Sequence, residues 1–243
     1  MPRFFVSESA VSEDGAHITG ADAHHIARAL RMAVGEEITV CTDAGRELLC
    51  RLSRIRDDEA VAEILFEGKS TAELPVSVTL YMAYPKGDKL ETVVQKAVEL
   101  GAARIVPFLS ERCIRRPKPE KLQSERERLS RIAQEAAKQC GRGVLPEVLS
   151  PLSFDEMLRA ATADSVALFC YEGKGTRPIR ALLEGEPPAR LSVIVGSEGG
   201  FSEGEAEAAR AAGCQMTGLG PRILRCETAP LYALSAISVL VEL

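Results

Sequence analysis

The sequence predicts an α/β protein in which a small β-rich domain precedes a larger domain built on a parallel sheet. In the first seventy residues, short runs of apolar and β-branched residues accompany a single helical stretch, which suggests a small barrel. Beyond residue 76 such runs alternate with helical segments, which is typical of a parallel sheet covered on both faces. The length of 243 residues suits one large domain or two small ones.

The first domain is predicted to cover residues 1–70, with a polar linker at 71–75. A short helix is expected from about Ala21 to Met32, because Ile26, Ala29 and Leu30 recur at helical spacing. Gly45 lies in a short polar segment typical of a hairpin. The predicted strands are Glu37 to Thr42, Glu47 to Ile55 and Ala60 to Phe66.

The second domain is predicted to cover residues 76–243. Its strands are expected at Val76–Ala83, Arg104–Leu109, Ser165–Tyr171, Leu191–Val195 and Cys214–Leu219. Helices are expected after Asp88, Ser153 and Ser202, since each is followed three residues later by a glutamate that completes a capping box. Two longer helices are expected at about Glu120–Cys140 and Thr228–Glu242.

Two glycine-bearing turns are the most informative feature of the second domain. The first follows a predicted strand and covers Gly196 to Gly200, and the second covers Leu219 to Thr228. Glycine turns at the carboxyl ends of parallel strands place bare backbone amides at the edge where open α/β sheets bind ligands. Either turn alone could equally be a structural connection that binds no ligand. The pair, with Glu198 in the first and charged residues in the second, favours a site for a nucleotide-like cofactor.

Several other sites and locations are excluded by the sequence. Neither the P-loop pattern nor the dinucleotide G-x-G-x-x-G pattern occurs at a suitable strand end. Seven dispersed cysteines without a C-x-x-C pair, and only three histidines, favour reduced thiols and no metal site. The first residues lack the apolar run of a signal peptide, and Ala229–Val241 is too short to span a bilayer. We therefore expect a cytoplasmic protein that does not enter the membrane.

A basic segment stands out in a chain whose net charge is −5. Residues 112–142 contain ten Lys and Arg against four Glu. A solvated helix face explains the charges from residue 120 onward. The arginines of the preceding loop, Arg112, Arg115 and Arg116, also fit a face that contacts phosphates, and charge alone does not decide between the two interpretations.

The whole chain resembles the bacterial family of small-subunit rRNA uridine N3-methyltransferases, which are S-adenosylmethionine enzymes of the trefoil-knotted class. Besides the two turns, four groups of residues carry the resemblance: His25 to Met32; Lys86-Gly87-Asp88-Lys89 with Gln95-Lys96 and Glu99-Leu100-Gly101; Ser110 to Cys113; and Glu135 to Arg142. The resemblance implies a PUA-like β-barrel that binds RNA, a knotted methyltransferase domain, and a homodimer formed through the knot. Ser197 replaces a usual proline and Cys226 a usual threonine, so we expect a slightly looser turn and the loss of one hydroxyl.

The resemblance also implies roles for individual residues. Arg225 is expected to stabilise negative charge on the uracil ring, and either Glu227 or Glu198 to take its N3 proton. The expected cofactor contacts are Leu168, Cys170, Gly196, Ser197, Gly199, Leu219, Gly220, Ile223, Leu224 and Cys226. The expected RNA contacts are Arg28, Arg31, Arg112, Arg115, Arg116 and Arg142. Two other functions remain open at this point: methylation of another RNA position, such as a ribose 2′-hydroxyl, and RNA binding without catalysis.

Overall fold

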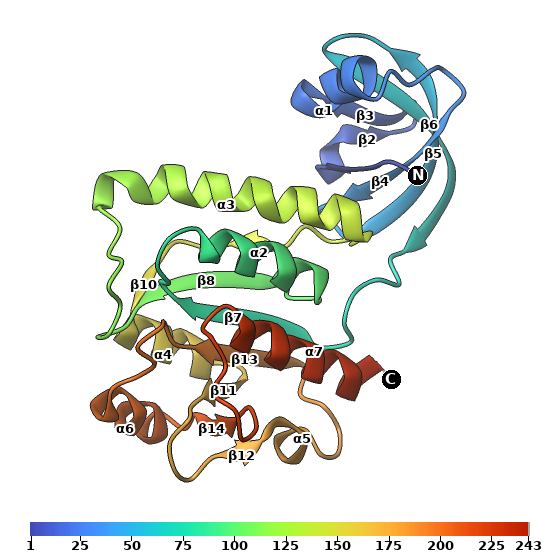
Figure 1. Cartoon of the computed structure of the whole chain (residues 1–243). Helices are drawn as coiled ribbons and strands as arrows, with labels where there is room; N and C mark the ends of the chain where they lie inside the picture. The colour runs from blue at the N-terminus through green and yellow to red at the C-terminus, as the bar shows by residue number, and fades with distance from the viewer. Residues whose placement is uncertain (243) are drawn as a thin grey trace. The chain divides into compact units, whose positions relative to one another are not determined.

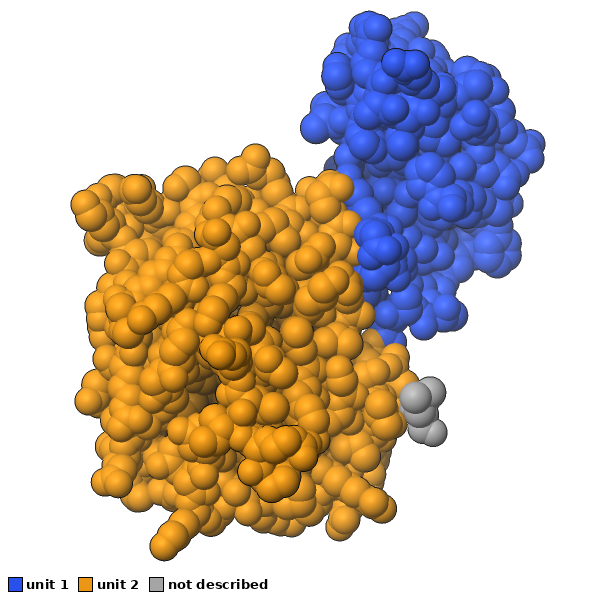
Figure 2. All heavy atoms as spheres, viewed as in Figure 1, with its two compact units in different colours: residues 1–73, 137–145 blue, residues 74–136, 146–243 orange. Residues whose placement is uncertain are grey.

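The computed structural model describes residues 1–242 and divides the chain into two compact units. The first unit contains residues 1–73 and 137–145, and the second contains residues 74–136 and 146–243 (Figure 2). A division of the chain at a single linker does not capture this arrangement, because residues 137–145 group with the first unit.

The first unit is built on a six-stranded sheet with the order β1-β4-β5-β6-β3-β2. β1 pairs in parallel with β4, and the other pairs are antiparallel. The unit buries a hydrophobic core that includes Phe4, Ile18, Ile38, Leu48 and Leu52. The strands are β1 (Arg3–Val6), β2 (Val11–Ser12), β3 (Gly15–Thr19), β4 (Glu37–Thr42), β5 (Arg46–Ile55) and β6 (Glu59–Lys69). The three predicted strands are confirmed, although β6 continues three residues beyond the predicted end at Phe66.

The helix expected from Ala21 to Met32 is shorter in the structure. An α-helix, α1, covers Gly20–His24, and a π-helical turn continues it over His25–Ala29. The wider turn destroys the predicted stripe, so Ile26 is buried while Leu30 is exposed. Arg31 then adopts a φ of 52°, a left-handed conformation that ends the helix.

The second unit is built on a sheet in which every pair of neighbouring strands is parallel, with the order β10-β8-β7-β13-β11-β14-β12 (Figure 1). The expected strands correspond to β7 (Ser77–Ala83), β8 (Arg104–Leu109), β11 (Val166–Cys170), β13 (Arg190–Val195) and β14 (Gln215–Gly218). Three two-residue strands, β9 (Glu147–Val148), β10 (Leu152–Ser153) and β12 (Arg177–Pro178), are too short to show a sequence pattern. β13 and β14 flank β11, which brings the two glycine turns to the same edge.

The helices are α2 (Lys89–Glu99), α3 (Pro119–Cys140), α4 (Phe154–Thr162), α5 (Ile179–Leu182), α6 (Glu203–Ala211) and α7 (Thr228–Glu242). The capping boxes predicted at Ser153 and Ser202 are confirmed. The one predicted at Asp88 is wrong: its side chain forms no cap, and Glu91 instead forms an ion pair with Arg128 of α3. No helix within residues 1–242 is long and apolar enough to cross a membrane.

Candidate cofactor and active site

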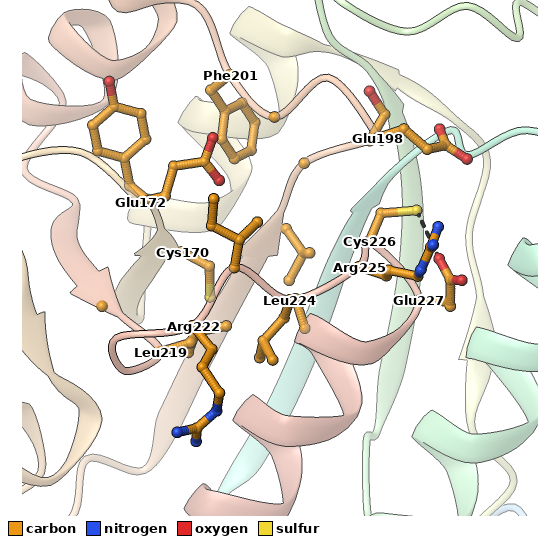
Figure 3. A pocket seen from close by; sticks show the side chains of 18 of the residues that line it. Cys170, Glu172, Glu198, Phe201, Leu219, Arg222, Leu224, Arg225, Cys226 and Glu227 are labelled. Atoms are coloured by element: carbon orange, nitrogen blue, oxygen red, sulfur yellow. Dashed lines mark hydrogen bonds between the residues drawn. The ribbon is translucent and has the colours of Figure 1, made fainter.

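The two glycine turns line a shared cavity of about 570 Å³ at the carboxyl edge of the parallel sheet. The end of β11 and the segment that follows it form a third wall. In Figure 3, Glu172 and Phe201 lie on one side of this cavity, and Arg225, Cys226 and Glu227 lie on the other. The structure therefore brings together groups that are more than fifty residues apart in the sequence.

The first turn is built into the core. Ser197 is 5% exposed, and its carbonyl oxygen accepts a 2.9 Å hydrogen bond from the amide of Gly200. Gly200 has a φ of 63°, which glycine adopts without the strain of a side chain. Phe201 closes the turn by packing against Phe169, with ring centroids 4.1 Å apart. This turn is fixed by its own backbone and by an aromatic anchor.

The loop that contains Arg112, Arg115 and Arg116, here called the basic loop, is hydrogen-bonded to the first turn. The Nη1 of Arg112 donates a 2.9 Å hydrogen bond to the carbonyl oxygen of Gly199. The hydroxyl of Ser197 donates in return to the carbonyl oxygen of Arg112, at 3.4 Å. A Cβ atom at Gly199 would lie 2.9 Å from the Cβ of Arg112, so the two backbones approach as closely as glycine permits. Ser197 thus gives the turn a hydrogen bond that a proline side chain does not form.

The second turn presents its side chains to the solvent and to the cavity. Ile223 is 86% exposed, and Arg222 and Arg225 are also exposed. Gly220 has a φ of 100°. The carbonyl oxygen of Arg225 accepts hydrogen bonds from the amides of Thr228 and Ala229 at 2.8 and 2.9 Å, and these bonds begin α7. The guanidinium of Arg225 is therefore carried on a backbone that is anchored at its helical end.

A lysine joins the carboxylates of the two turns. The Nζ of Lys89 lies 3.0 Å from Oε1 of Glu198 and 3.2 Å from Oε2 of Glu227. The thiol of Cys226 donates a 3.2 Å hydrogen bond to the same oxygen of Glu227. The amide of Lys86 donates to Glu198 at 3.0 Å. Four side chains from three separate segments therefore form one hydrogen-bonded group at the cavity.

These contacts shift the pKa values of the group. Burial acts to raise the pKa of Glu198, but backbone hydrogen bonds and Lys89 outweigh it and leave the pKa lowered. The pKa of Glu227 is lowered mainly by a backbone hydrogen bond, with help from Cys226 and Lys89. Hydrogen bonds to the two carboxylates raise the pKa of Lys89. Both carboxylates are consequently ionised at neutral pH.

Cys226 does not fit the role of a nucleophile. Burial, together with the neighbouring Glu227, raises the pKa of its thiol to about 12. The reactive form of cysteine is the thiolate, which is scarce at neutral pH under these conditions. Cys226 is therefore a lining residue that donates a weak hydrogen bond.

Most of the expected cofactor contacts line the cavity. Cys170, Gly196, Ser197, Gly199, Leu219, Gly220, Ile223, Leu224 and Cys226 all do so. Leu168 does not: it lies on β11 two residues before the sheet edge, and its side chain is fully buried in the core. The expected catalytic residues Arg225, Glu227 and Glu198 are all brought to the same cavity.

Sequence reasoning missed several lining residues. Lys89, Tyr171, Glu172 and Thr176 contribute to the walls. Lys89 belongs to the Lys86-Gly87-Asp88-Lys89 motif, which the sequence shows. Its partners Glu198 and Glu227, however, lie 109 and 138 positions later in the chain, so the motif alone does not reveal the contact. The other three follow β11, where Gly173 and Gly175 are a glycine signal after a strand that could have located them.

The arginines expected to contact RNA fall into two groups. Arg112, Arg115 and Arg116 lie in the loop before α3, where Arg115 pairs with Glu125 at 2.7 Å and Arg116 donates to the carbonyl oxygen of Ser110. In the first unit, Arg28 and Arg31 lie together at the end of the π-helical turn and are exposed. Arg28 pairs with Asp57 at 2.6 Å.

Arg142 differs from the other arginines because it is buried. Its side chain is 3% exposed and donates to both carboxylate oxygens of Glu73, at distances of 2.6 to 2.9 Å. The amide of Gly143 donates to Glu73 as well. The pair fastens residues 137–145 to residues 1–73 within the first unit. The expectation that Arg142 contacts RNA therefore does not fit the structure, because its guanidinium is buried against Glu73.

Comparisons with known proteins address the family. A family model described as an RNA methyltransferase domain matches residues 72–238, and one described as an RNA methyltransferase PUA domain matches residues 18–65. Ribosomal RNA small subunit methyltransferase E of Bacillus subtilis is 37% identical over 93% of this chain and 90% of its own length. The chain belongs to the ribosomal RNA small subunit methyltransferase E family.

Further relatives agree with this identification. The family member from Synechocystis is 34% identical over 99% of this chain and 78% of its own length. A crystal structure of the family member from Neisseria gonorrhoeae, bound to S-adenosyl methionine, superposes with a TM-score of 0.84 at 33% identity, covering 99% of this chain and 98% of that one. The expected fold class is confirmed: a small PUA-like β domain is followed by the knotted α/β methyltransferase domain.

No group of three or more His, Cys, Asp or Glu side chains suited to a metal ion occurs in the part of the chain that the structure describes.

Proposed function

We propose that this protein transfers a methyl group from S-adenosylmethionine to N3 of a uridine in small-subunit ribosomal RNA. The observation that carries the proposal is the shared cavity, in which both glycine turns meet Arg225, Glu198 and Glu227. Membership of the methyltransferase E family supports the reaction and the RNA class.

The cavity suits the cofactor. Its volume lies within the range of about 300–1,000 Å³ usual for small-molecule sites. Glycines at 196, 199, 218 and 220 leave the backbone accessible to a ligand, and Glu172 and Glu198 suit one with cationic groups. S-adenosylmethionine supplies a methyl group on a positively charged sulfonium, which makes alignment the main task of the protein.

The residues of the second turn supply the chemistry at the base. Loss of the N3 proton builds negative charge on the uracil ring, and the guanidinium of Arg225 is placed to stabilise that charge. Glu198 and Glu227 are the two candidates to accept the proton, because both are ionised and both line the cavity. N3 lies on the Watson–Crick edge, so the target base must be unpaired or flipped out of a helix.

The exposed arginines provide the contacts to phosphate. Arg112 and Arg116 form one such surface in the methyltransferase unit, and Arg115, which is half-buried and pairs with Glu125, lies between them in the sequence. Arg28 and Arg31 form another in the PUA-like unit. Such contacts fix the position of the RNA without reading its sequence.

We also propose a homodimer formed through the methyltransferase unit, in the cytoplasm. α7 packs against α2, α5 and β13 with its buried face, which includes Ala233, Leu234 and Ile237. Tyr232 and Val239 are exposed on another face of this helix, and Leu240 is exposed near its end. An apolar surface of this kind is typical of a subunit interface.

The test is to incubate the protein with S-adenosylmethionine and small ribosomal subunits that lack the modification, and then to digest the RNA for nucleoside mass spectrometry. We expect one N3-methyluridine per subunit. A ribose 2′-O-methyl product instead would show a different target on the same fold. Cofactor binding without any methylated product, from subunits and from naked RNA alike, would favour an RNA-binding protein that does not catalyse.

A further inference from the structure

The position of Lys89 is not explained by the helix on which it lies. Lys89 is the first residue of α2, at the positive end of the helix dipole, where a cation is unfavourable. It is held there by the carboxylates of Glu198 and Glu227, which lie 3.0 and 3.2 Å from its ammonium group. The lysine therefore serves the two turns rather than its own helix.

The two carboxylates are held in different ways. Oε1 of Glu198 accepts hydrogen bonds from both the amide of Lys86 and the ammonium of Lys89, each at 3.0 Å. These bonds tie the first turn to the loop before α2. Glu227 instead forms an ion pair with Lys89 and accepts a hydrogen bond from the thiol of Cys226, which is a weak donor. Glu227 is also two residues from Arg225, the group proposed to stabilise charge on the base.

We propose that Lys89 is a positioning residue that divides the work of the two carboxylates, so that Glu198 fastens the first turn while Glu227 accepts the uracil N3 proton. The inference rests on the proposed uridine methylation. In the step assigned to Glu227, the N3–H bond breaks, its electron pair stays on N3 for bonding to the methyl carbon, and the proton goes to a carboxylate oxygen of Glu227.

The electrostatics support a need for the cation. Two carboxylates that share a site repel each other, and that repulsion raises the pKa of one of them. The ammonium of Lys89 lies between them and counters the repulsion, with the amide of Lys86 and the thiol of Cys226 as further donors. Without Lys89, Glu227 loses a counter-charge and one of the contacts that orient its carboxylate.

The experiment combines Lys89→Met with Glu198→Gln and with Glu227→Gln. Single-turnover methylation of small subunits is measured at saturating S-adenosylmethionine, cofactor affinity by calorimetry, and folding by thermal unfolding. We expect Glu227→Gln to slow methylation by about 10²–10⁴-fold, the usual contribution of a general base, with cofactor affinity little changed. We expect Glu198→Gln to act mainly on cofactor affinity and melting temperature.

The decisive measurement is how much Lys89→Met slows methylation in the wild type and in each of the two glutamate variants. Lys89→Met alone should slow methylation by about 10–100-fold, which is typical of losing a partner that orients a functional group. In the Glu227→Gln background the same substitution should add little, because its target is already absent. In the Glu198→Gln background it should keep its full effect on the rate. Lys89→Arg should restore most of the rate, since it keeps the charge.

Lys96→Met is the matched control. Lys96 lies on the same helix and pairs with Glu99 at 2.8 Å, outside the cavity. Its loss should leave methylation and cofactor affinity unchanged.

Three results would overturn the division of roles. The first is that Lys89→Met slows methylation as much in the Glu227→Gln background as in the wild type, and the second is that it no longer slows methylation in the Glu198→Gln background. The third is that Lys89→Arg methylates as slowly as Lys89→Met. A wild-type protein that forms no N3-methyluridine would instead contradict the proposed function itself.

Discussion

The two turns around the cavity are built in contrasting ways. The first turn is buried at both ends, at Val195–Ser197 and at Phe201, and exposes Glu198 and Gly199 between them. It is hydrogen-bonded within itself and tied to Arg112 and to the Lys86 amide. The second turn exposes Arg222, Ile223 and Arg225, and it is anchored where α7 begins. The difference indicates that the first turn is a preformed frame, while the second turn carries side chains that remain available to a ligand.

This contrast has a physical rationale. A frame that is fixed before binding loses little conformational entropy when the ligand arrives. Groups that act on the reacting base must instead face an open space that the base can enter. Placing these two tasks on separate turns lets a substitution disturb one of them without the other.

The largest effect is expected from Arg225→Ala in the second turn. Turnover should fall by about 10²–10³-fold, the usual cost of losing one group that stabilises developing negative charge. Cofactor affinity should change little, because the first turn is untouched. The measurements are initial rates of methylation and calorimetric titration with S-adenosylmethionine.

Arg222→Ala is the matched comparison. Arg222 lies in the same turn, and its side chain points away from Cys226 and Glu227 (Figure 3). It should cause a clearly smaller loss of turnover. Equal losses in the two variants would mean that Arg225 acts only through the charge of the turn.

Gly199→Val should damage the frame itself. The new Cβ would lie 2.9 Å from the Cβ of Arg112, so the turn or the basic loop must move. We expect a loss of cofactor affinity worth about 1–3 kcal/mol, the usual cost of overpacking. Equilibrium titration with the cofactor measures it.

Gly204→Ala is the control for this substitution. Gly204 lies on α6, and the nearest atom to its new Cβ is 3.9 Å away. It should leave cofactor affinity unchanged and raise stability by up to about 1 kcal/mol. Unchanged cofactor affinity in Gly199→Val would show that the first turn adjusts freely and is not a frame.

Ser202→Ala tests how the frame is held at its exit. Ser202 and Glu205 form a capping box, and Glu205 also accepts a 2.8 Å hydrogen bond from the amide of Glu111 in the basic loop. Losing the cap should cost about 1 kcal/mol of stability. Because the loop and the turn share this anchor, cofactor affinity should fall too.

Ser153→Ala removes the same type of capping box from α4. It should cause a similar loss of stability in thermal unfolding but no loss of cofactor affinity. Equal effects of the two serines on affinity would contradict a specific link between α6 and the first turn.

The smallest effect concerns pH. Glu198 and Glu227 have lowered pKa values, so the stability they add is present above the ordinary value of 4.5 and is lost as the pH falls through their folded pKa. Lys89 has a raised pKa, so its contribution persists below its ordinary value of 10.5. The melting-temperature difference between wild type and Lys89→Met should therefore be constant from pH 6 to 9 and shrink below pH 4. A difference that grows in acid would contradict this pairing.

The repeating features of the fold were predictable from the sequence. Apolar runs located the five longer strands of the parallel sheet, and Ser-x-x-Glu patterns located the starts of α4 and α6. The two-residue strands and the four-residue α5 were not predictable, because they depend on tertiary contacts rather than on a repeating pattern. The π-helical turn after His24 escaped prediction for a similar reason, since the sequence there fits an ordinary helix.

The site was predictable as far as local motifs reach. The glycine turns located the cavity, and Arg225, Glu198 and Glu227 line it as expected. Lys89 was given no role from the sequence, and Arg142 was expected to contact RNA, because the position of each side chain depends on a partner far away in the chain. Glu73, which lies 69 positions before Arg142, accepts hydrogen bonds from its buried guanidinium. Glu198, which lies 109 positions after Lys89, accepts a hydrogen bond from its ammonium group at the cavity.

The most direct test of the contrast between the two turns is amide hydrogen exchange with and without saturating S-adenosylmethionine. We expect peptides covering residues 195–202 to exchange slowly in the free protein and to change little when the cofactor binds. We expect peptides covering residues 219–227 to exchange quickly in the free protein and to slow markedly on binding. Similar rates for the two turns in the free protein, with similar protection on binding, would contradict the account of a preformed frame and a separate reactive turn.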